Sequence, residues 1–189
     1  MKKYRNDYRQ NGKEFDYTGK WHGTEMSVEE LEKYGYLYTG LMTGVLLIYI
    51  ASLMLNNAGS RVFWILIPHM LMIFPVSYGI MGGVSLILFC KKRDKGEKSQ
   101  VRIPQEHIGH MTRAEYEKGI RRPVRCSVAV AGFSLFTCLS NLIFMVRGTG
   151  NMSCGGDISF EIAAAIILAL GSVSAVQSCQ IKAKFTIFE

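Results

Sequence analysis

Four long apolar blocks constrain this chain more than any other feature of its sequence. They cover residues 36–55, 62–90, 124–146 and 158–178, and none contains more than one Lys, Arg, Asp or Glu. Each is long enough to cross a hydrocarbon core of about 30 Å as a helix. Only helices and closed barrels satisfy the backbone in lipid, and the blocks lack the alternation of barrel strands. The sequence therefore predicts an all-α, polytopic membrane protein with four transmembrane helices.

The basic residues predict how these helices are oriented. Of the 22 Lys and Arg residues, seven precede the first block, eleven lie in residues 91–125 and two follow the fourth block. The remaining two, Arg61 and Arg147, stand in the two short connections. The positive-inside bias then places both termini and the central loop in the cytoplasm, and we expect the cell membrane as the location. The net charge of +7 reflects this topology and attraction to anionic lipid, so the bilayer is an expected partner and nucleic acid is not.

The sequence gives little evidence for a signal peptide, a disulfide framework or a metal site. A polar stretch of about 35 residues precedes the first block, so we expect an uncleaved first helix. Five scattered cysteines without a paired spacing predict neither disulfides nor bound zinc. Glu106, His107 and His110 share the central loop, but without a further ligand they read as solvated residues. We therefore expect no metal and no cofactor.

Two similar phrases indicate an internal repeat. Residues 110–119, HMTRAEYEKG, resemble residues 25–34, EMSVEELEKY, at an offset of 85. Further along, GGVSLILFCKKRDK from Gly82 resembles GSVSAVQSCQIKAK from Gly171 at an offset of 89. Two matched blocks in the same order favour tandem duplication of a helical hairpin, although chance similarity between two membrane hairpins is the alternative.

The repeat predicts how the chain is divided. A polar cytoplasmic segment, 1–20, is followed by a first hairpin unit, 21–105, and a second unit, 106–189. Because each unit contains two spans, both units have the same orientation. They would be parallel repeats related by a pseudo-twofold axis along the membrane normal.

The repeated phrase has the composition of a helix start. Ser27 with Glu30, and Thr112 with Glu115, fit the capping box, in which a hydroxyl and a carboxylate three residues later bond each other's backbone N–H. The simplest interpretation is a capped helix start, and a dedicated docking motif is the alternative.

Each capped phrase is expected to begin a short cytoplasmic lead-in helix. These helices are predicted at about 27–34 and 112–121, before the spans at 36–55 and 124–146. Pro123 should separate the second lead-in helix from its span, because proline pushes the preceding residue out of helical geometry.

Small residues and prolines indicate where the helices pack closely or bend. Three pairs with GxxxG-like spacing are expected at helix–helix contacts, namely Gly40 with Gly44, Gly79 with Gly83, and Gly171 with Ala175. Pro68 and Pro75 should kink the second span. A kinked span either lines a transport site or is a simple packing feature.

Polar residues gather at the outer ends of the spans. They are Asn56, Arg61, His69, Asn141, Arg147, Asp157 and Glu161. Because ionisable groups inside a membrane are costly, we predict an outward-facing polar site formed by His69, Asn141 and Glu161, with Arg147 as an ion partner. The alternative is that the charged groups extend to the interface and His69 bonds a carbonyl freed by a proline.

The function predicted from these features is not enzymatic. The chain lacks a Walker loop, a zincin motif, a CxxC pair and a Gly-x-Ser-x-Gly motif. We expect an accessory, sensory or immunity-type membrane subunit that binds a membrane protein partner, or a second copy of itself, through its transmembrane faces and lead-in helices. A small transporter or channel with an outward-facing site is the alternative, and an intramembrane enzyme ranks third.

Overall fold

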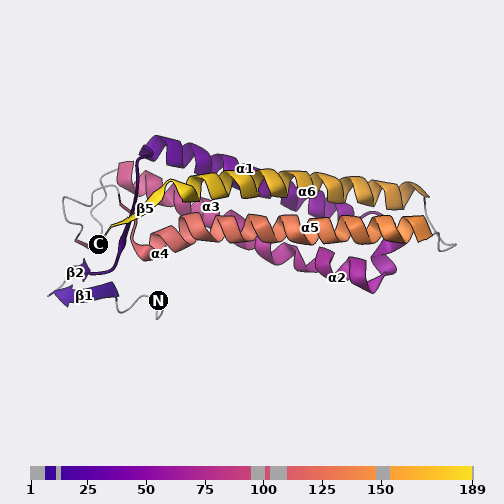
Figure 1. The fold of residues 1–189 in the computed structure, drawn as a ribbon, viewed down its shortest axis with the longest axis horizontal. Coiled ribbons are helices and arrows are strands. Elements are labelled where there is room, and N and C mark those ends of the chain that lie inside the picture. The colour runs from indigo at the N-terminus through magenta and orange to yellow at the C-terminus, as the bar shows by residue number, and fades with distance from the viewer. Residues whose placement is uncertain (1–6, 12–13, 95–100, 103–109, 148–153, 189) are drawn as a thin grey trace.

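The structure, a computed structural model, describes residues 7–11, 14–94, 101–102, 110–147 and 154–188. Long helices run side by side and short strands gather at one end (Figure 1). The helices are α1 (Val28–Leu53), α2 (Phe63–Leu71), α3 (Ile73–Asp94), α4 (Arg113–Tyr116), α5 (Arg122–Arg147) and α6 (Cys154–Ala183), with a 3-10 turn η2 (Gly59–Arg61) and a π-helical segment η4 (Glu117–Arg121). The strands are β1 (Tyr8–Asn11), β2 (Glu14–Tyr17), β3 (Trp21–Thr24), β4 (Val101–Arg102) and β5 (Phe185–Phe188).

Four helical spans in the described part of the chain are long and apolar enough to cross a membrane. They are α1, α2 with α3, α4 through α5, and α6. Their outer faces carry large exposed apolar side chains, including Leu47, Phe63, Phe136 and Ile162. In water such faces would be unfavourable, whereas in lipid they are well solvated. The predicted four helices with the length and apolar composition of membrane spans are present, which is consistent with a membrane-embedded protein.

The spans close into a ring around one apolar core. Helix α1 packs against α3 and α6, and α5 packs against α6, α3 and α2. Tyr38, Met42 and Val45 of α1 are fully buried at the centre, where they belong to one cluster with Val130 of α5 and Ile167 of α6. The described side chains therefore fill the centre of the bundle.

The small-residue pairs differ in what they contact. An added Cβ at Gly79 would lie 2.9 Å from the Tyr38 hydroxyl, and one at Gly171 would lie 3.0 Å from Val130. The backbones of α1, α3, α5 and α6 approach closely at these glycines, as small residues allow. Gly40 is different, because a Cβ there would meet no atom within 4 Å. Its partner Gly44 is only in ordinary contact with Leu170, so this pair does not pack a helix inside the bundle.

The second span is interrupted between its two prolines. Helix α2 ends at Leu71 and α3 begins at Ile73, with Met72 between them. Pro68 lies inside α2, and Pro75 stands in the first turn of α3, where a missing backbone N–H costs little. The predicted kink is present and divides the span into a short and a long helix.

The expected lead-in helices are not separate from the spans. Helix α1 runs without a break through Gly35, so a distinct helix at 27–34 was wrong. Helix α4, the π-helical segment and α5 form one continuous rod that includes Pro123, so the predicted separate helix at 112–121 was also wrong. Proline cannot donate to the carbonyl four residues earlier, and the wider π turn just before it provides room for its ring. Gly82 leaves further space, because a Cβ there would lie 3.0 Å from that ring.

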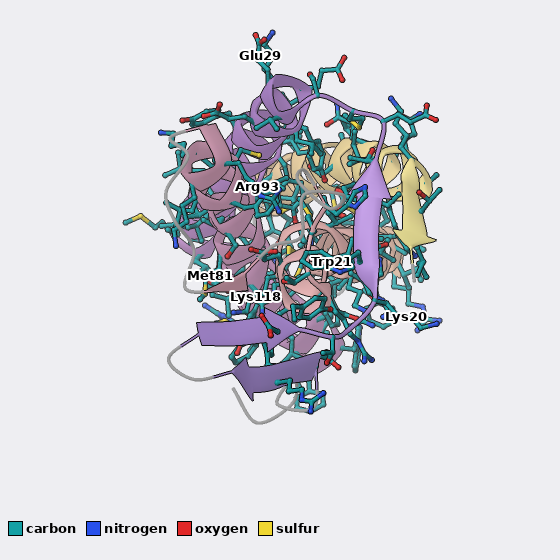
Figure 2. The ribbon with its side chains drawn as sticks, turned by 90° about the vertical axis from the view of Figure 1, so that its left-hand side faces the viewer. Lys20, Trp21, Glu29, Met81, Arg93 and Lys118 are labelled. Carbon is teal, nitrogen blue, oxygen red and sulfur yellow. The ribbon has the colours of Figure 1, made fainter. Side chains whose placement is uncertain are left out.

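The all-α expectation was incomplete, because the helical rods carry strands at one end, here called the strand end. Strand β3 pairs antiparallel with β5, so Trp21 faces Phe188 across the ladder. Residues 7–17, expected as a plain polar segment, contain the β1–β2 hairpin, and β4 pairs parallel with β2. Figure 2 views this end, with β3 and β5 side by side over the helix ends. The strands are too short for a period-two signal to separate them from loop sequence.

Candidate functional site

Asp157 is the buried acid at the opposite end of the bundle, here called the turn end, where residues 54–62 join α1 to α2. It lies in the first turn of α6 and has no exposed surface. Its Oδ1 atom accepts hydrogen bonds from the backbone N–H groups of Ala58, at 2.8 Å, and Gly59, at 3.2 Å. An acid is favourable at the positive end of a helix. Asp157 therefore fastens the α1–α2 connection to the start of α6.

Asn141 links α5 to α6 at the same end of the bundle. It is fully buried on α5, and its Nδ2 donates to Oε2 of Glu161 on α6 at 2.9 Å. Its Oδ1 lies 2.6 Å from the position that a Cβ at Gly59 would take, so a larger residue there would displace the Asn141 amide. The structure thus brings together Asn141 and Glu161, two members of the predicted outer polar site.

His69 lies nearby but makes different contacts. It is buried on α2, with Nε2 at 3.0 Å from the Ser52 hydroxyl and its ring between Tyr49 and Phe160, each with a ring centroid 5.0 Å away. Ser52 donates its own proton to the Tyr49 carbonyl, so the histidine Nε2–H is the donor in the shared bond. His69 is therefore held by α1 and α6, not by the Asn141–Glu161 pair.

The structure does not place Arg147 in the polar site, and it gives Asp157 a central position that the sequence did not predict. Arg147 is exposed at the end of α5 and makes no ion pair with a residue that the structure describes. Asp157, which was noted only as one of the polar residues near the outer ends, is central. The available signal was spacing, because Asp157 stands four residues before Glu161 and so shares its helical face. The contacts of Gly59 with Asn141 and Asp157 could not be predicted from the spacing of residues in the sequence.

Several buried polar atoms at the turn end lack a hydrogen-bond partner. They are Nδ1 of His69, Oδ1 of Asn141 and Oδ2 of Asp157. A cavity of about 230 Å³ adjoins His69 and is lined by Ser52, Leu53, Leu55, Asn57, Ile65, Leu66, His69, Met70 and Phe160. Since buried polar groups are normally satisfied, a cluster of exceptions marks this end as a candidate binding site.

An apolar groove runs between α2 and α5 on the outside of the bundle. It has a volume of about 640 Å³ and is lined by Phe63, Trp64, Ile67, Pro68, Leu71, Ala129, Gly132, Phe133 and Phe136. The small residues Gly132 and Ala129 leave space on its α5 side, and a Cβ at Gly132 would meet no atom within 4 Å. The aromatic side chains form the walls. The groove is therefore open to whatever surrounds the spans.

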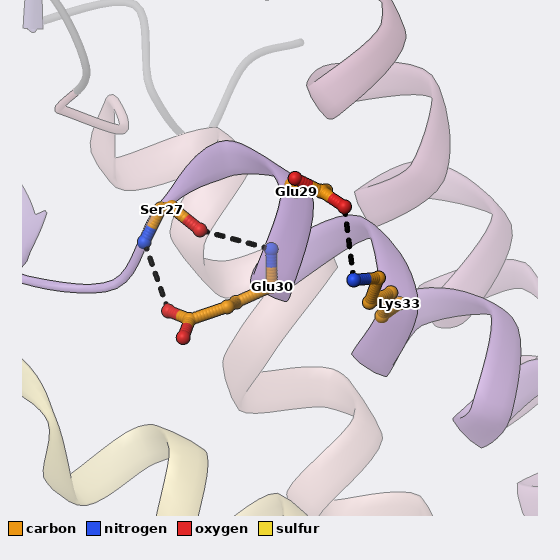
Figure 3. A network of polar contacts seen from close by, with 4 residues as sticks. All are labelled: Ser27, Glu29, Glu30 and Lys33. Atoms are coloured by element: carbon orange, nitrogen blue, oxygen red, sulfur yellow. Dashed lines mark hydrogen bonds and ion pairs between the residues drawn. The ribbon is translucent and has the colours of Figure 1, made fainter.

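Both predicted capping boxes are present at the strand end. Ser27 Oγ accepts from the Glu30 backbone at 3.2 Å while Glu30 Oε2 accepts from the Ser27 backbone at 3.1 Å (Figure 3). Thr112 and Glu115 form the equivalent bonds at 3.4 and 2.8 Å. These bonds satisfy backbone donors that a helix start leaves open. Two phrases far apart in sequence thus have the same local structure.

His22 links the strands to the second capped phrase. Its backbone exchanges two hydrogen bonds with Met111, at 2.9 and 2.7 Å. Its ring stacks on Tyr116 with centroids 4.0 Å apart and planes at 5°. Burial lowers the pKa of His22, and the positive charge of Arg113 lowers it further. The imidazole is therefore held in its neutral form by the packing of β3 against α4.

We expect acid to loosen this link. Because the folded state lowers the pKa of His22 below its usual 6.5, the stability it contributes is complete above that pH and is lost as the pH falls through the folded pKa. Amide hydrogen exchange in β3 and β5 should therefore be faster at pH 5.5 than at pH 7.5, after correction for intrinsic rates. In a His22→Phe variant, which keeps a stackable ring, the corrected rates should be the same at both pH values. An unchanged pH effect in the variant would contradict the role of His22.

Nothing in the described residues groups three or more His, Cys, Asp or Glu side chains around a metal. Glu106 and His107 of the central loop lie outside the described residues. Cys90, Cys126, Cys138 and Cys179 are free thiols.

Comparison with known proteins identifies no protein similar to this chain. No family model, no curated protein and no solved structure matches this chain. Function is therefore inferred from the residues themselves.

Proposed function

We propose that this protein is a non-enzymatic integral membrane subunit, of accessory, sensory or immunity type, that binds a partner membrane protein within the bilayer. The observation that carries the proposal is the apolar groove between α2 and α5. In the orientation we propose, the strand end lies in the cytoplasm of a cell whose plasma membrane holds the four spans, in keeping with the basic residues that flank them on that side.

The shape of the groove fits a helix of the partner. Its α5 side offers the small residues Ala129 and Gly132, and its rim offers the large side chains Phe63 and Trp64, which are 71% and 60% exposed. Helices associate in lipid where small residues allow close approach, and aromatic side chains provide contact area around them. A transmembrane helix is therefore the occupant we propose.

The filled core also supports a binding subunit over a channel. Tyr38, Met42 and Val45 occupy the centre of the described bundle together with Val130 and Ile167. A single copy thus has apolar side chains where a conducting path would run. The two units, which we take to be a tandem duplication of one hairpin, each supply a capped helix start to the strand end, and these capped starts are a second surface for the partner.

The groove is tested by filling it. A Gly132→Leu variant should lose the partner, because the new side chain occupies the space that the partner helix needs. The matched control is Gly40→Leu, since a Cβ at either glycine meets no atom within 4 Å and both lie on outer faces. The measurement is the set of proteins that co-purify with each variant from native membranes, compared by quantitative mass spectrometry. We expect at least about a tenfold loss of the partner for Gly132→Leu and none for Gly40→Leu.

The reverse result would overturn the groove as the interface. If Gly40→Leu loses the partner and Gly132→Leu retains it, then the Gly40–Gly44 face of α1 is the binding surface. If the only protein lost is a second copy of this chain, then the interface is homo-oligomeric. Equal loss in both variants, with each remaining folded, would mean that the partner does not depend on the α2–α5 groove.

A small transporter is the second candidate function. It is favoured by the unpaired buried polar atoms of His69, Asn141 and Asp157 at the turn end, by the cavity that His69 lines, and by the interrupted second span. Purified protein reconstituted alone in liposomes separates the two. Movement of an ion or solute that a Glu161→Gln change abolishes would favour transport, while a subunit with no transport function leaves the liposomes tight.

A further inference from the structure

Oxygen atoms from three parts of the chain converge on Gly59 at the turn end. Oδ1 of Asn141 and Oδ1 of Asn57 lie 2.6 and 3.6 Å from the Cβ position of Gly59. Asp157 reaches the backbone N–H of the same glycine at 3.2 Å. Glu161 follows one turn later on α6 and is joined to Asn141 at 2.9 Å. These side chains supply two carboxylates and two amide oxygens, which are the ligand types that hard cations prefer.

Two of these residues are completely buried and still have an unused acceptor atom. Asp157 and Asn141 each have 0% exposure, and Oδ2 of the first and Oδ1 of the second have no hydrogen-bond partner. The bonds that Asp157 makes to Ala58 and Gly59 use its other oxygen, so fastening the connection does not account for Oδ2. An acceptor without a donor, buried beside a carboxylate, is a costly arrangement unless a positive charge satisfies it.

The protein supplies no such charge among the described residues. Arg61 and Arg147, the basic residues nearest this end in sequence, are both exposed, and neither forms an ion pair with a described acid. Asp157 and Glu161 carry two negative charges when ionised, which one divalent cation neutralises. Ca²⁺ accepts six to eight oxygen ligands in irregular geometry, whereas Mg²⁺ requires a near-ideal octahedron. Ligands from a connection and two helices suit the larger ion.

We propose that the turn end is a Ca²⁺ site in which Asp157, Asn141, Asn57 and Glu161 supply the protein ligands. Bound Ca²⁺ joins α5 and α6 to the α1–α2 connection and stabilises the folded bundle. In the orientation proposed above, this end faces the outside of the cell, where calcium is abundant. The site does not depend on the α2–α5 groove, so either inference can fail without the other.

Binding is tested on the purified full chain in detergent micelles. Calcium chloride should raise the thermal unfolding midpoint in a saturable way, because a ligand that binds only the folded state stabilises it. Equilibrium dialysis with radioactive Ca²⁺ should give one ion per chain. Magnesium chloride at the same concentration, and sodium chloride at the same ionic strength, should give smaller shifts.

The variants separate charge from structure. Asp157→Asn keeps an oxygen that accepts from Ala58 and Gly59 while removing the charge, and Glu161→Gln keeps an acceptor for Asn141. Each should fold and bind Ca²⁺ about tenfold or more weakly, since affinity follows the number of charged ligands. The control is Glu29→Gln, an exposed carboxylate at the strand end that pairs with Lys33 and should change nothing.

Two outcomes would overturn the site. The first is a wild-type chain that binds no Ca²⁺ in the dialysis experiment. The second is full Ca²⁺ binding by Asp157→Asn or by Glu161→Gln. If Asp157→Asn does not fold, Glu161→Gln and the dialysis of the wild-type chain decide alone. Equal shifts with Ca²⁺, Mg²⁺ and Na⁺ would indicate general screening of charge, which also contradicts a Ca²⁺ site.

Discussion

Replacing Gly83 with leucine should destabilise the bundle by about 3 kcal/mol, because overfilling a tight helix contact forces backbones apart. A Cβ at this position would collide with the Thr39 hydroxyl and would lie 3.0 Å from the Tyr38 ring. Tyr38 is fully buried, so displacing it disturbs the core. The rest of a leucine side chain has no space between α1 and α3. Unfolding of the purified protein in mixed micelles, titrated with a denaturing detergent, measures the loss.

Gly40→Leu is the control for this change. It introduces the same side chain into the same kind of helix, but at a position where a Cβ meets no atom within 4 Å. Because leucine is also the better helix former, its stability should be equal to or slightly above that of the wild type. Equal destabilisation by both substitutions would mean that Gly83 does not act through the α1–α3 contact.

These two glycines illustrate what the sequence could and could not predict. Gly40 and Gly83 belong to GxxxG-like pairs that look alike in one dimension. Only the arrangement of the spans determines that Gly83 faces α1 and that Gly40 faces outward. The number of spans, in contrast, followed from apolar length alone, because the cost of exposing a backbone in lipid leaves few alternatives.

Local chemistry was similarly predictable where it depended on neighbours in sequence. The capping boxes of Ser27 and Thr112 are present because hydroxyl and carboxylate stand three residues apart. The separate lead-in helices were wrong because a π-helical segment lets the helix continue through Pro123. Proline breaks a regular α-helix because its ring clashes with the preceding turn, and the wider π turn avoids this clash.

The strands and the turn-end cluster depend on contacts between distant residues. Strand β3 forms only because β5, more than 160 residues later, provides its partner. Asp157 becomes important through the backbone of Ala58 and Gly59, which no spacing along α6 could indicate. Asn141 and Glu161, two members of the predicted polar site, are hydrogen-bonded because both are placed at the same depth in adjacent helices. The depth of each polar residue along its span was predictable from the sequence, whereas the residues that face it from other helices were not.

Tyr38→Ala should destabilise the bundle by about 4 kcal/mol, because it leaves a cavity where α1, α3 and α5 meet. Tyr38 is fully buried, and its hydroxyl donates to the Pro123 carbonyl at 3.1 Å. Its ring and hydroxyl also lie against Gly79 and Gly83, so no glycine side chain can fill the space. Tyr38→Phe keeps the ring and removes only the hydrogen bond, and should therefore cost about 1 kcal/mol. Both values are measured by the same detergent titration, and similar losses for the two variants would mean that the hydroxyl, not the ring, holds the first unit to the second.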